Sequence, residues 1–260
     1  MSKAFQSWSK YWGFLYEDRD VRFPSRVYGF ENTSRNKTDS AIVPDDGACY
    51  GFVSAGKALL VGKGDRKCAP LVEGQWFSTD SGCCLELSEP SSAVFVSQRI
   101  GYRGVFTTGG PIETKGRLRY IDGCSDSLLC CPPVIGDPCF NHLHFPGGIN
   151  QTQHTHPSLR AGVVARGAGW CHTPDAQIRL LPNLIFVIPT DALHRFETEE
   201  GTSMDVVPYH PDSDWGPSHE EHPMVNRTLV EGKKIDNTQG RHAFADLAVG
   251  SFMDAIPRIN

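Results

Sequence analysis

Three histidines combine residue types and a spacing that suit a metal ion. His154 and His156 are separated by one residue, and His194 follows an apolar run at 184–188 and Pro189. Side chains at positions i and i+2 of a β-strand lie on the same face, so one strand can direct two imidazoles at one ion while a neighbouring strand supplies a third. Three neutral imidazoles leave coordination positions open, which suits a catalytic Fe, Ni, Cu, Mn or Zn ion better than a closed structural site. The sequence therefore predicts a metal centre at His154, His156 and His194.

The residues around the paired histidines resemble the first sequence motif of the cupins, a superfamily of β-barrel proteins. That motif has a glycine, then two histidines in the order His-x-His, then a glutamate and a second glycine. Gly148, His154, His156 and Gly167 match its spacing, and Arg160 stands where the family usually has the glutamate. The missing glutamate makes the centre similar to the three-histidine iron dioxygenases of the superfamily. It is less similar to the four-ligand oxalate decarboxylase and germin-like sites.

The second cupin motif matches less completely. Pro189 and His194 correspond to its proline and histidine, whereas Asn183 and Asp191 replace two glycines and Thr198 replaces an asparagine. The resemblance implies an all-β fold, the double-stranded β-helix or jelly-roll barrel of the cupins.

The resemblance covers about residues 117–212, and a short internal similarity relates 58–68 to 161–171. This repeat predicts a bicupin-like duplication, in which a degenerate N-terminal barrel has apolar side chains and no metal ligands. Its offset places Gly51 and Val53 opposite the paired histidines. The predicted parts are an N-terminal extension, a degenerate cupin-like half, a metal-binding cupin domain and a C-terminal extension, at 1–44, 45–112, 113–212 and 213–260.

Short runs of apolar and β-branched residues between Gly, Ser, Pro and Asp predict strands in both halves. The predicted strands are 49–53, 58–63, 82–87, 92–98, 117–121, 139–145, 151–156, 160–166, 178–188 and 193–196.

Further side chains are predicted to take part in catalysis. Arg160 has the same strand parity as the paired histidines, so we expect it to face the ion and bind a substrate carboxylate. The alternatives are an ion pair with an internal Asp or Glu, or a bulge that turns Arg160 outward. Tyr209 and His172 are candidates for a general base near the ion, as is Glu197. No separate cofactor-binding residues are predicted, because the two Gly-x-Gly turns lack the context of a nucleotide site.

Three functions are compatible with these residues. The first is a non-haem Fe(II)-dependent cupin dioxygenase acting on a small, metal-chelating, carboxylate-bearing substrate, with O2 as co-substrate. The second is a Zn-, Ni- or Mn-dependent cupin lyase or isomerase on a small carboxylated or sugar-derived substrate. The third is a non-catalytic ligand-binding cupin.

Composition narrows the expected partners. The 260 residues are 39% hydrophobic and carry a net charge of −5 with dispersed Lys and Arg, so we expect no nucleic-acid partner. No run of 18 apolar residues and no signal-peptide pattern at the N-terminus are seen, and the nine cysteines are an odd number. We therefore expect a cytoplasmic protein with no membrane partner. The family resemblance implies a homo-oligomer, a dimer.

Overall fold

The computed structural model describes residues 5–34, 37–62, 68–132, 134, 136–213, 229–230 and 233–234. Its regular structure is almost entirely β-strand, with one short 3-10 helix, η1 (Ile121–Gly123). The chain up to Asp214 forms one compact unit. A second unit follows, in which β21 (Leu229–Val230) pairs with β22 (Lys233–Lys234), and the rest of the predicted C-terminal extension lies outside the described residues. The described residues include no helix of the length and apolarity needed to cross a membrane.

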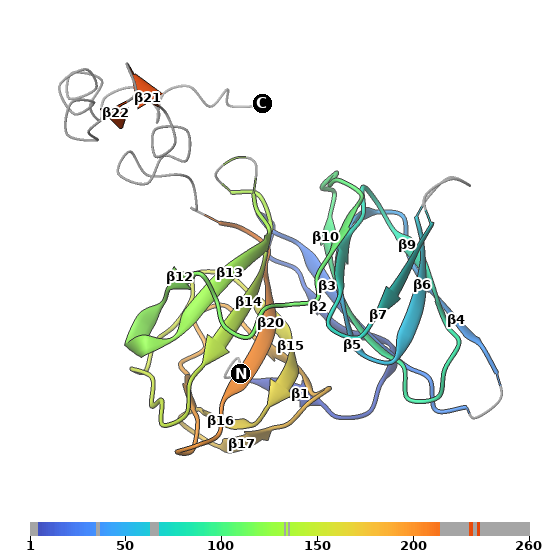
Figure 1. The fold of residues 1–260 in the computed structure, drawn as a ribbon. Helices are drawn as coiled ribbons and strands as arrows, with labels where there is room; N and C mark the ends of the chain where they lie inside the picture. Colours follow the sequence, from blue (N-terminus) through green and yellow to red (C-terminus); the bar gives the residue numbers. More distant parts are fainter. Residues whose placement is uncertain are drawn as a thin grey trace. The chain divides into compact units, whose positions relative to one another are not determined.

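The N-terminal barrel, drawn in blue to teal in Figure 1, has a six-stranded and a four-stranded sheet. Their strand orders are β11-β8-β5-β10-β3-β2 and β4-β9-β6-β7, and all pairings are antiparallel. Apolar side chains of both sheets fill the space between them, among them Tyr28, Leu60 and Phe77. The strands are β2 (Trp12–Asp18), β3 (Ser25–Glu31), β4 (Asp39–Val43), β5 (Gly47–Ala55), β6 (Lys57–Gly62), β7 (Cys68–Val72), β8 (Trp76–Ser78), β9 (Cys83–Leu87), β10 (Ala93–Ile100) and β11 (Thr107–Gly109).

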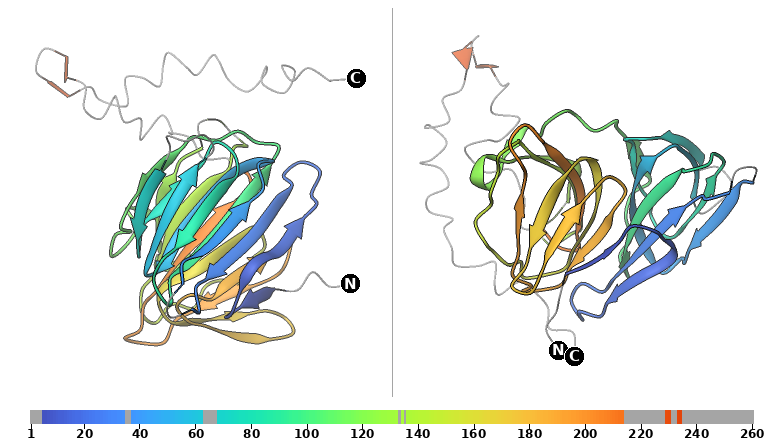
Figure 2. Two further views of the ribbon diagram at one scale, coloured as in Figure 1. Left: turned by 90° about the vertical axis from the view of Figure 1, so that its right-hand side faces the viewer. Right: turned by 90° about the horizontal axis from the view of Figure 1, so that it is seen from below.

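The C-terminal barrel, drawn in green to orange except for the blue β1, has a seven-stranded sheet β1-β18-β15-β20-β14-β13-β12 and a three-stranded sheet β17-β16-β19. Figure 2 shows the barrels from two further sides. Leu143, Phe145, Phe196 and Val206 belong to its core. The strands are β1 (Gln6–Trp8), β12 (Leu118–Arg119), β13 (Ser125–Cys130), β14 (Cys139–Phe145), β15 (Arg160–Gly167), β16 (Gly169–His172), β17 (Gln177–Leu180), β18 (Ile185–Ile188), β19 (Arg195–Glu197) and β20 (Met204–His210).

The N-terminal segment departs from the predicted domain boundaries. Residues 1–44 were expected to be an extension, but β2, β3 and β4 are strands of the N-terminal barrel, and β1 pairs with β18 of the C-terminal barrel. Tyr28 and Phe30 of β3 supply side chains to the core of the N-terminal barrel. The first barrel therefore begins near residue 12.

The two barrels share one topology, which confirms the predicted pair of cupin-like barrels. The order β8-β5-β10-β3-β2 repeats as β18-β15-β20-β14-β13, and β7-β6-β9 repeats as β17-β16-β19. The register predicted from the internal similarity is wrong, because β6 is equivalent to β16 and not to β15. Gly51 and Val53 therefore do not lie opposite the paired histidines. The N-terminal counterpart of the segment with His154 and His156 is β4. β4 pairs with β9, and the segment with the histidines pairs with the chain at β19, which is the equivalent of β9.

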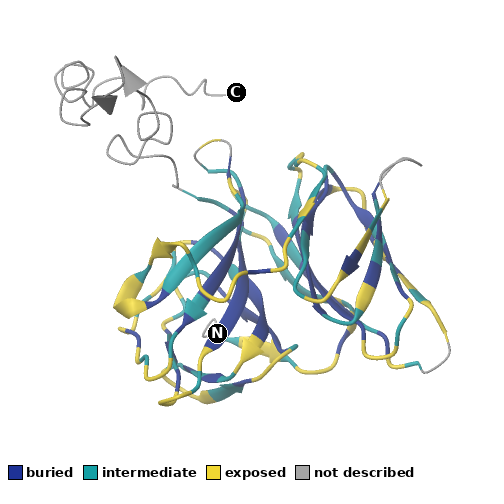
Figure 3. Ribbon diagram, viewed as in Figure 1, coloured by how far each residue is buried: buried dark blue, intermediate teal, exposed yellow. Residues whose placement is uncertain are grey.

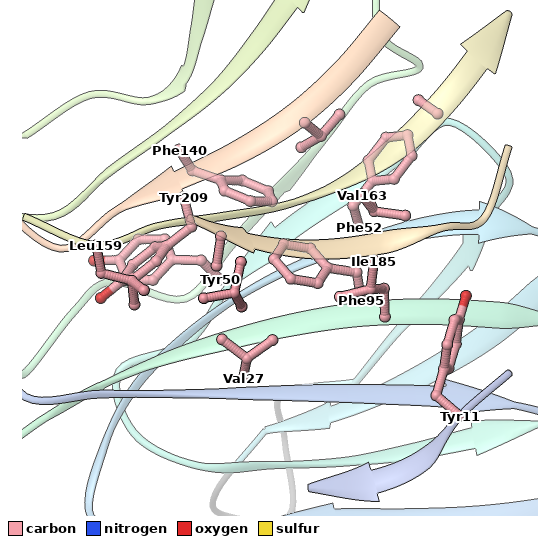
Figure 4. Close-up of a cluster of buried hydrophobic side chains, with 14 of the residues drawn as sticks. Tyr11, Val27, Tyr50, Phe52, Phe95, Phe140, Leu159, Val163, Ile185 and Tyr209 are labelled. Carbon is pink, nitrogen blue, oxygen red and sulfur yellow. The ribbon is translucent and has the colours of Figure 1, made fainter. Parts of the chain in front are cut away.

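A third hydrophobic cluster joins the six-stranded and seven-stranded sheets (Figure 4). Phe52 and Phe95 come from the N-terminal barrel, and Phe140 and Tyr209 come from the C-terminal barrel. Burying each such side chain contributes about 1.5–3 kcal/mol. Figure 3 shows that the strands contributing to this cluster are largely buried. The outer face of β20 is thus committed to packing, and only its inner face is available to a site.

Candidate metal centre

His154 and His194 are placed opposite each other by a small piece of antiparallel pairing. The backbone N–H of His154 donates to the carbonyl of His194 at 2.9 Å, and the N–H of His194 donates to the carbonyl of His154 at 3.0 Å. The N–H of Asp191 donates to the carbonyl of His156 at 2.8 Å. The predicted strand at 151–156 is therefore an irregular segment with isolated bridges, held at its ligand positions by backbone hydrogen bonds.

The residues that depart from the second cupin motif keep its backbone conformation. Asn183 has φ 69° and Asp191 has φ 62°, both in the left-handed region that glycine otherwise occupies and that Asn and Asp tolerate best. Thr198 replaces the asparagine and anchors the loop before the histidines. Its Oγ1 accepts from the N–H of Ile149 at 3.0 Å and donates to the carbonyl of Pro146 at 2.5 Å.

The motif glycine Gly167 is required by close packing as well as by its φ of 70°. A Cβ at this position would lie 1.9 Å from the carbonyl oxygen of Ser203, a separation that backbone atoms cannot accommodate. The close approach lets β15 and β20 pair as far as Gly167, so the ligand-bearing barrel closes at this end.

The three histidines converge. One nitrogen from each of His154, His156 and His194 lies within 4.8 Å of the others, and the ring centroids are 4.6–5.1 Å apart. Nδ1 of His154 lies 2.7 Å from the carbonyl of Thr152, and Nδ1 of His194 lies 2.9 Å from that of Ala192. A carbonyl can only accept, so each Nδ1 carries the proton and each Nε2 keeps its lone pair.

The state of these rings fits a metal ion that prefers nitrogen ligands. Nε2 of His194 is buried and has no hydrogen-bond partner, which is the condition of a ligand atom facing an ion. Burial, with the nearby Arg160 and histidines, lowers the pKa of His156 to about 3, and burial lowers the pKa of His194 to about 4. Both rings are therefore neutral at physiological pH, the form that binds metals. His154, His156 and His194 form a group that could hold a metal ion.

A cavity of about 40 Å³ adjoins the histidines. Its lining is mostly apolar, with Phe186, Ile188 and Val206, and includes Arg160. Arg160 therefore faces the centre as predicted by its parity. It also meets the alternative expectation of an internal ion pair, because Nη1 lies 3.6 Å from Asp212 Oδ1. Nη1 donates to Ser158 Oγ at 2.6 Å, whereas Nε is buried without a partner.

The structure places Tyr209, His172 and Glu197 away from the cavity. Tyr209 lies on the outer face of β20 in the cluster of Figure 4, fully buried, with its hydroxyl 3.1 Å from Ser25 Oγ. Burial raises its pKa, which opposes a role as a base. His172 lies in the three-stranded sheet, with Nε2 3.0 Å from Glu197 Oε2. None of the three lines the cavity around the metal ligands.

Four polar residues that sequence reasoning did not assign to the site line the cavity: Tyr120, Asp126, Gln151 and His210. His210 follows Tyr209 on β20 and so faces inward where its neighbour faces outward. Burial, with Arg160 and His156, lowers the pKa of His210 well below its usual value. Gln151 lies in an irregular segment to which strand parity does not apply. Its Oε1 accepts from the N–H of Phe196 at 3.3 Å.

Asp126 is a half-buried carboxylate that lines the cavity, and its Oδ1 atom is buried. It lies on β13, opposite Leu143 of β14, which also lines the cavity. Burial raises the pKa of Asp126 to about 6, although a 2.7 Å hydrogen bond from Asn141 Nδ2 to its Oδ2 opposes the rise. The strand that contains Asp126 was not predicted, so the face on which its side chain lies could not be predicted either. Residues 125–127 are three consecutive polar residues, Ser-Asp-Ser, which give no alternating strand pattern.

No family model matches the chain, and no curated protein sequence is significantly similar to it. Solved structures are similar at low identity. A cupin 2 conserved barrel domain protein from Leptotrichia buccalis has 11% identity and a TM-score of 0.51, over 80% of this chain and 89% of its own. Oxalate decarboxylase of Bacillus subtilis, described with Mn(II) centres, has 10% identity and a TM-score of 0.52, over 83% and 79%.

Salicylate 1,2-dioxygenase from Pseudaminobacter salicylatoxidans has 12% identity and a TM-score of 0.50, over 72% of this chain and 70% of its own. At such identities the likeness concerns the fold. Together with the repeated strand order and the three-histidine group, it shows that this chain has the cupin fold, with two barrels of which the C-terminal one carries a possible metal site.

Proposed function

We propose that the protein is a metal-dependent cupin enzyme, and that it is a non-haem Fe(II) dioxygenase acting on a small, metal-chelating carboxylate. The observation that carries this proposal is the group of His154, His156 and His194 beside a cavity that also contains Arg160. Three neutral imidazoles without a carboxylate ligand leave the full charge of a divalent ion and several open coordination positions for substrate and O2. Iron(II), when bound, supplies the electrons that O2 needs in order to react.

Arg160 supports the assignment of an anionic substrate. A guanidinium beside a divalent cation is costly unless an anion lies between them. Asp212 neutralises Arg160 on the side of Nη1, and the buried Nε remains without a partner. A substrate carboxylate that accepts from this Nε–H satisfies Arg160 and contributes negative charge toward the ion.

The size of the cavity limits the substrate. A volume of about 40 Å³ compares with roughly 10–15 Å³ for one water molecule on this measure, and with about 300–1,000 Å³ for pockets that bind drug-sized ligands. The cavity in this conformation therefore favours an acid of a few non-hydrogen atoms over an aromatic ring.

Metal analysis and oxygen uptake test the proposal. We expect about one iron per chain in the purified or anaerobically loaded protein and little in His154→Ala, because three ligands are needed to hold the ion. An oxygen electrode then compares small thiol carboxylates, β-dicarbonyls and dihydroxybenzoates, and we expect uptake with the small carboxylates. Iron binding without substrate-dependent uptake across the panel would contradict the dioxygenase assignment.

Asp126 favours a second candidate, a Zn-, Ni- or Mn-dependent lyase or isomerase. Such chemistry needs a general base near a Lewis-acidic ion, and a half-buried carboxylate with a pKa of about 6 in the same cavity is suited to that role. Oxalate decarboxylase, a protein of the same fold, is described with Mn(II) centres. Stoichiometric Zn, Ni or Mn, with turnover of a small carboxylate and no O2 uptake, would favour this candidate. Ligand binding without turnover would indicate the non-catalytic cupin.

A further inference from the structure

Three buried polar atoms of the cavity residues have no hydrogen-bond partner, and each has a different chemistry. Nε2 of His194 offers a lone pair to a metal ion, Nε of Arg160 offers an N–H, and Oδ1 of Asp126 is an acceptor. Buried polar groups are normally paired, so unpartnered atoms around one small cavity indicate what its ligand provides. A metal ion would accept the lone pair of His194 Nε2, and a substrate carboxylate would accept a hydrogen bond from Arg160 Nε. Asp126 Oδ1 would accept a hydrogen bond from a donor on the same ligand.

Only one oxygen of Asp126, Oδ1, is available to accept a hydrogen bond from a ligand. Its other oxygen, Oδ2, accepts the 2.7 Å hydrogen bond from Asn141 Nδ2. That bond orients the carboxylate, and the inward position of Asp126 on β13 directs it toward the cavity that the histidines share. Burial raises its pKa to about 6, so it is charged at neutral pH yet able to take up a proton.

We propose that Asp126 accepts a hydrogen bond, and then the proton, from a hydroxyl or thiol of the substrate while Arg160 holds the substrate carboxylate. The substrate class is accordingly a small carboxylic acid with a hydroxyl or thiol close to its carboxylate. This inference rests on the proposed function, because the deprotonated oxygen or sulfur is the atom that would chelate the ion.

The proton transfer is balanced without any further reactant. The O–H or S–H bond of the substrate breaks, and a new O–H bond forms at Asp126 Oδ1. The electron pair stays on the substrate oxygen or sulfur, which is left as an anion. Nothing is oxidised or reduced, and Asp126 can return the proton to the product.

Ligand binding to the full-length protein loaded with one equivalent of zinc tests this assignment. Zinc binds imidazole and does not change its oxidation state. Glycolate and acetate are the probes, because they are small carboxylates that differ by one hydroxyl group. We expect glycolate to bind the wild-type protein at least roughly tenfold more tightly than acetate by calorimetry, the effect of one hydrogen bond to a charged group. In Asp126→Asn, which cannot take up the proton, we expect most of this preference to be lost.

Asp175→Asn is the matched control, because Asp175 is an exposed carboxylate outside the cavity lining. It should keep the wild-type preference, and all three proteins should hold equal zinc. Equal preference in Asp126→Asn and wild type, with zinc bound, would overturn the role of Asp126 and leave the metal site intact. No preference for glycolate in the wild-type protein would overturn the substrate class. Failure of the wild-type protein to bind zinc or iron would overturn the proposed function together with this inference.

Discussion

The two barrels have the same strand order and different interiors. In the N-terminal barrel, β4 pairs with β9 at five successive positions, and Ala41 and Val43 are buried in the core. The equivalent segment of the C-terminal barrel forms isolated bridges with the chain around β19 at Asn150 and His154, with no continuous strand ladder in this part of the described chain. The comparison shows that the metal centre lies where the C-terminal barrel lacks the regular strand pairing of the N-terminal barrel. Side chains freed from strand alternation can turn toward an ion, and the space between the sheets stays open.

One pair of packed residues is retained in both barrels. The ring of Phe77 lies against Gly51 in the first barrel, and the ring of Phe186 lies against Gly162 in the second, so that a Cβ on either glycine would come within 3 Å of the ring. Phe77 is fully buried in a closed core, whereas Phe186 lines the cavity. The same aromatic position is therefore structural in one barrel and borders the site in the other.

The largest expected effect is the loss of metal binding when one of the three histidine ligands in the C-terminal barrel is removed. His194→Ala removes one of three ligands, and we expect the metal affinity to fall by at least about 100-fold, more than the loss of an outer hydrogen-bond partner costs. His172→Ala is the control, because His172 belongs to the same barrel and does not line the cavity. Metal titration of both variants checks this. Equal loss of metal in the two would show that any disturbance of the barrel empties the site.

Truncation of a core side chain in the N-terminal barrel should lower the stability of the protein without changing metal binding. We expect Phe77→Ala to lower the free energy of unfolding by about 3–5 kcal/mol, since a fully buried phenylalanine leaves a cavity. Denaturant unfolding measures the loss, and metal analysis of the folded variant should give the wild-type stoichiometry. A fall in stoichiometry would mean that the N-terminal barrel contributes to the centre.

The anion-binding side of the site should respond to Arg160. We expect Arg160→Gln to weaken glycolate binding to the metal-loaded protein by about 1.5–3 kcal/mol, the range for a hydrogen bond to a charged group. The metal stoichiometry should remain, because Arg160 is not a ligand. Calorimetric titration with glycolate measures the affinity, and metal analysis of the same protein measures the metal stoichiometry. Unchanged affinity would place the substrate carboxylate elsewhere.

The smallest expected effect concerns stability and pH. The pKa of Asp126 is raised from 3.8 to about 6 in the folded protein, so the folded state binds its proton more tightly than the unfolded state. The free energy of unfolding therefore falls as pH rises from about 4 to about 6, and the penalty is complete above that range. We expect Asp126→Asn to be more stable than wild type at pH 8, on the order of 1–2 kcal/mol, and equal to it near pH 4. Thermal unfolding at both pH values checks this, and a stability gain of the same size at pH 4 would contradict it.

The convergence of the three histidines could be predicted from their local spacing, and the fold was predicted through the resemblance to the cupin motifs. Predicted strands such as 139–145 and 160–166 lie on β14 and β15. The predicted strand at 178–188 is two strands, β17 and β18, separated by a turn in which Asn183 has a positive φ. Pro182 and Asn183 interrupt this apolar segment, and the prediction of one strand did not treat the pair as a turn signal.

The other polar groups of the site depend on which face of a strand points inward, and this cannot be read from one chain. Tyr209 was predicted to be a candidate base, but its neighbour His210 is the residue that lines the cavity. The N-terminal barrel decides the matter, because it covers the outer face of β20 and takes Tyr209 into the shared core. Asp126 depended on an unpredicted strand. The roles assigned to these side chains, and a cytoplasmic homodimer, remain predictions.

The backbone pairing of His154 with His194 has a further consequence. These two ligands bracket the chain segment that contains β15 to β18, so an ion bound to both would act as a removable crosslink across that loop. Without the ion, the segment around His154 is held mainly by two isolated bridges, which open at low free-energy cost. A bound ion would therefore slow the exchange of these amide protons with solvent and restrict the chain entropy of the whole loop.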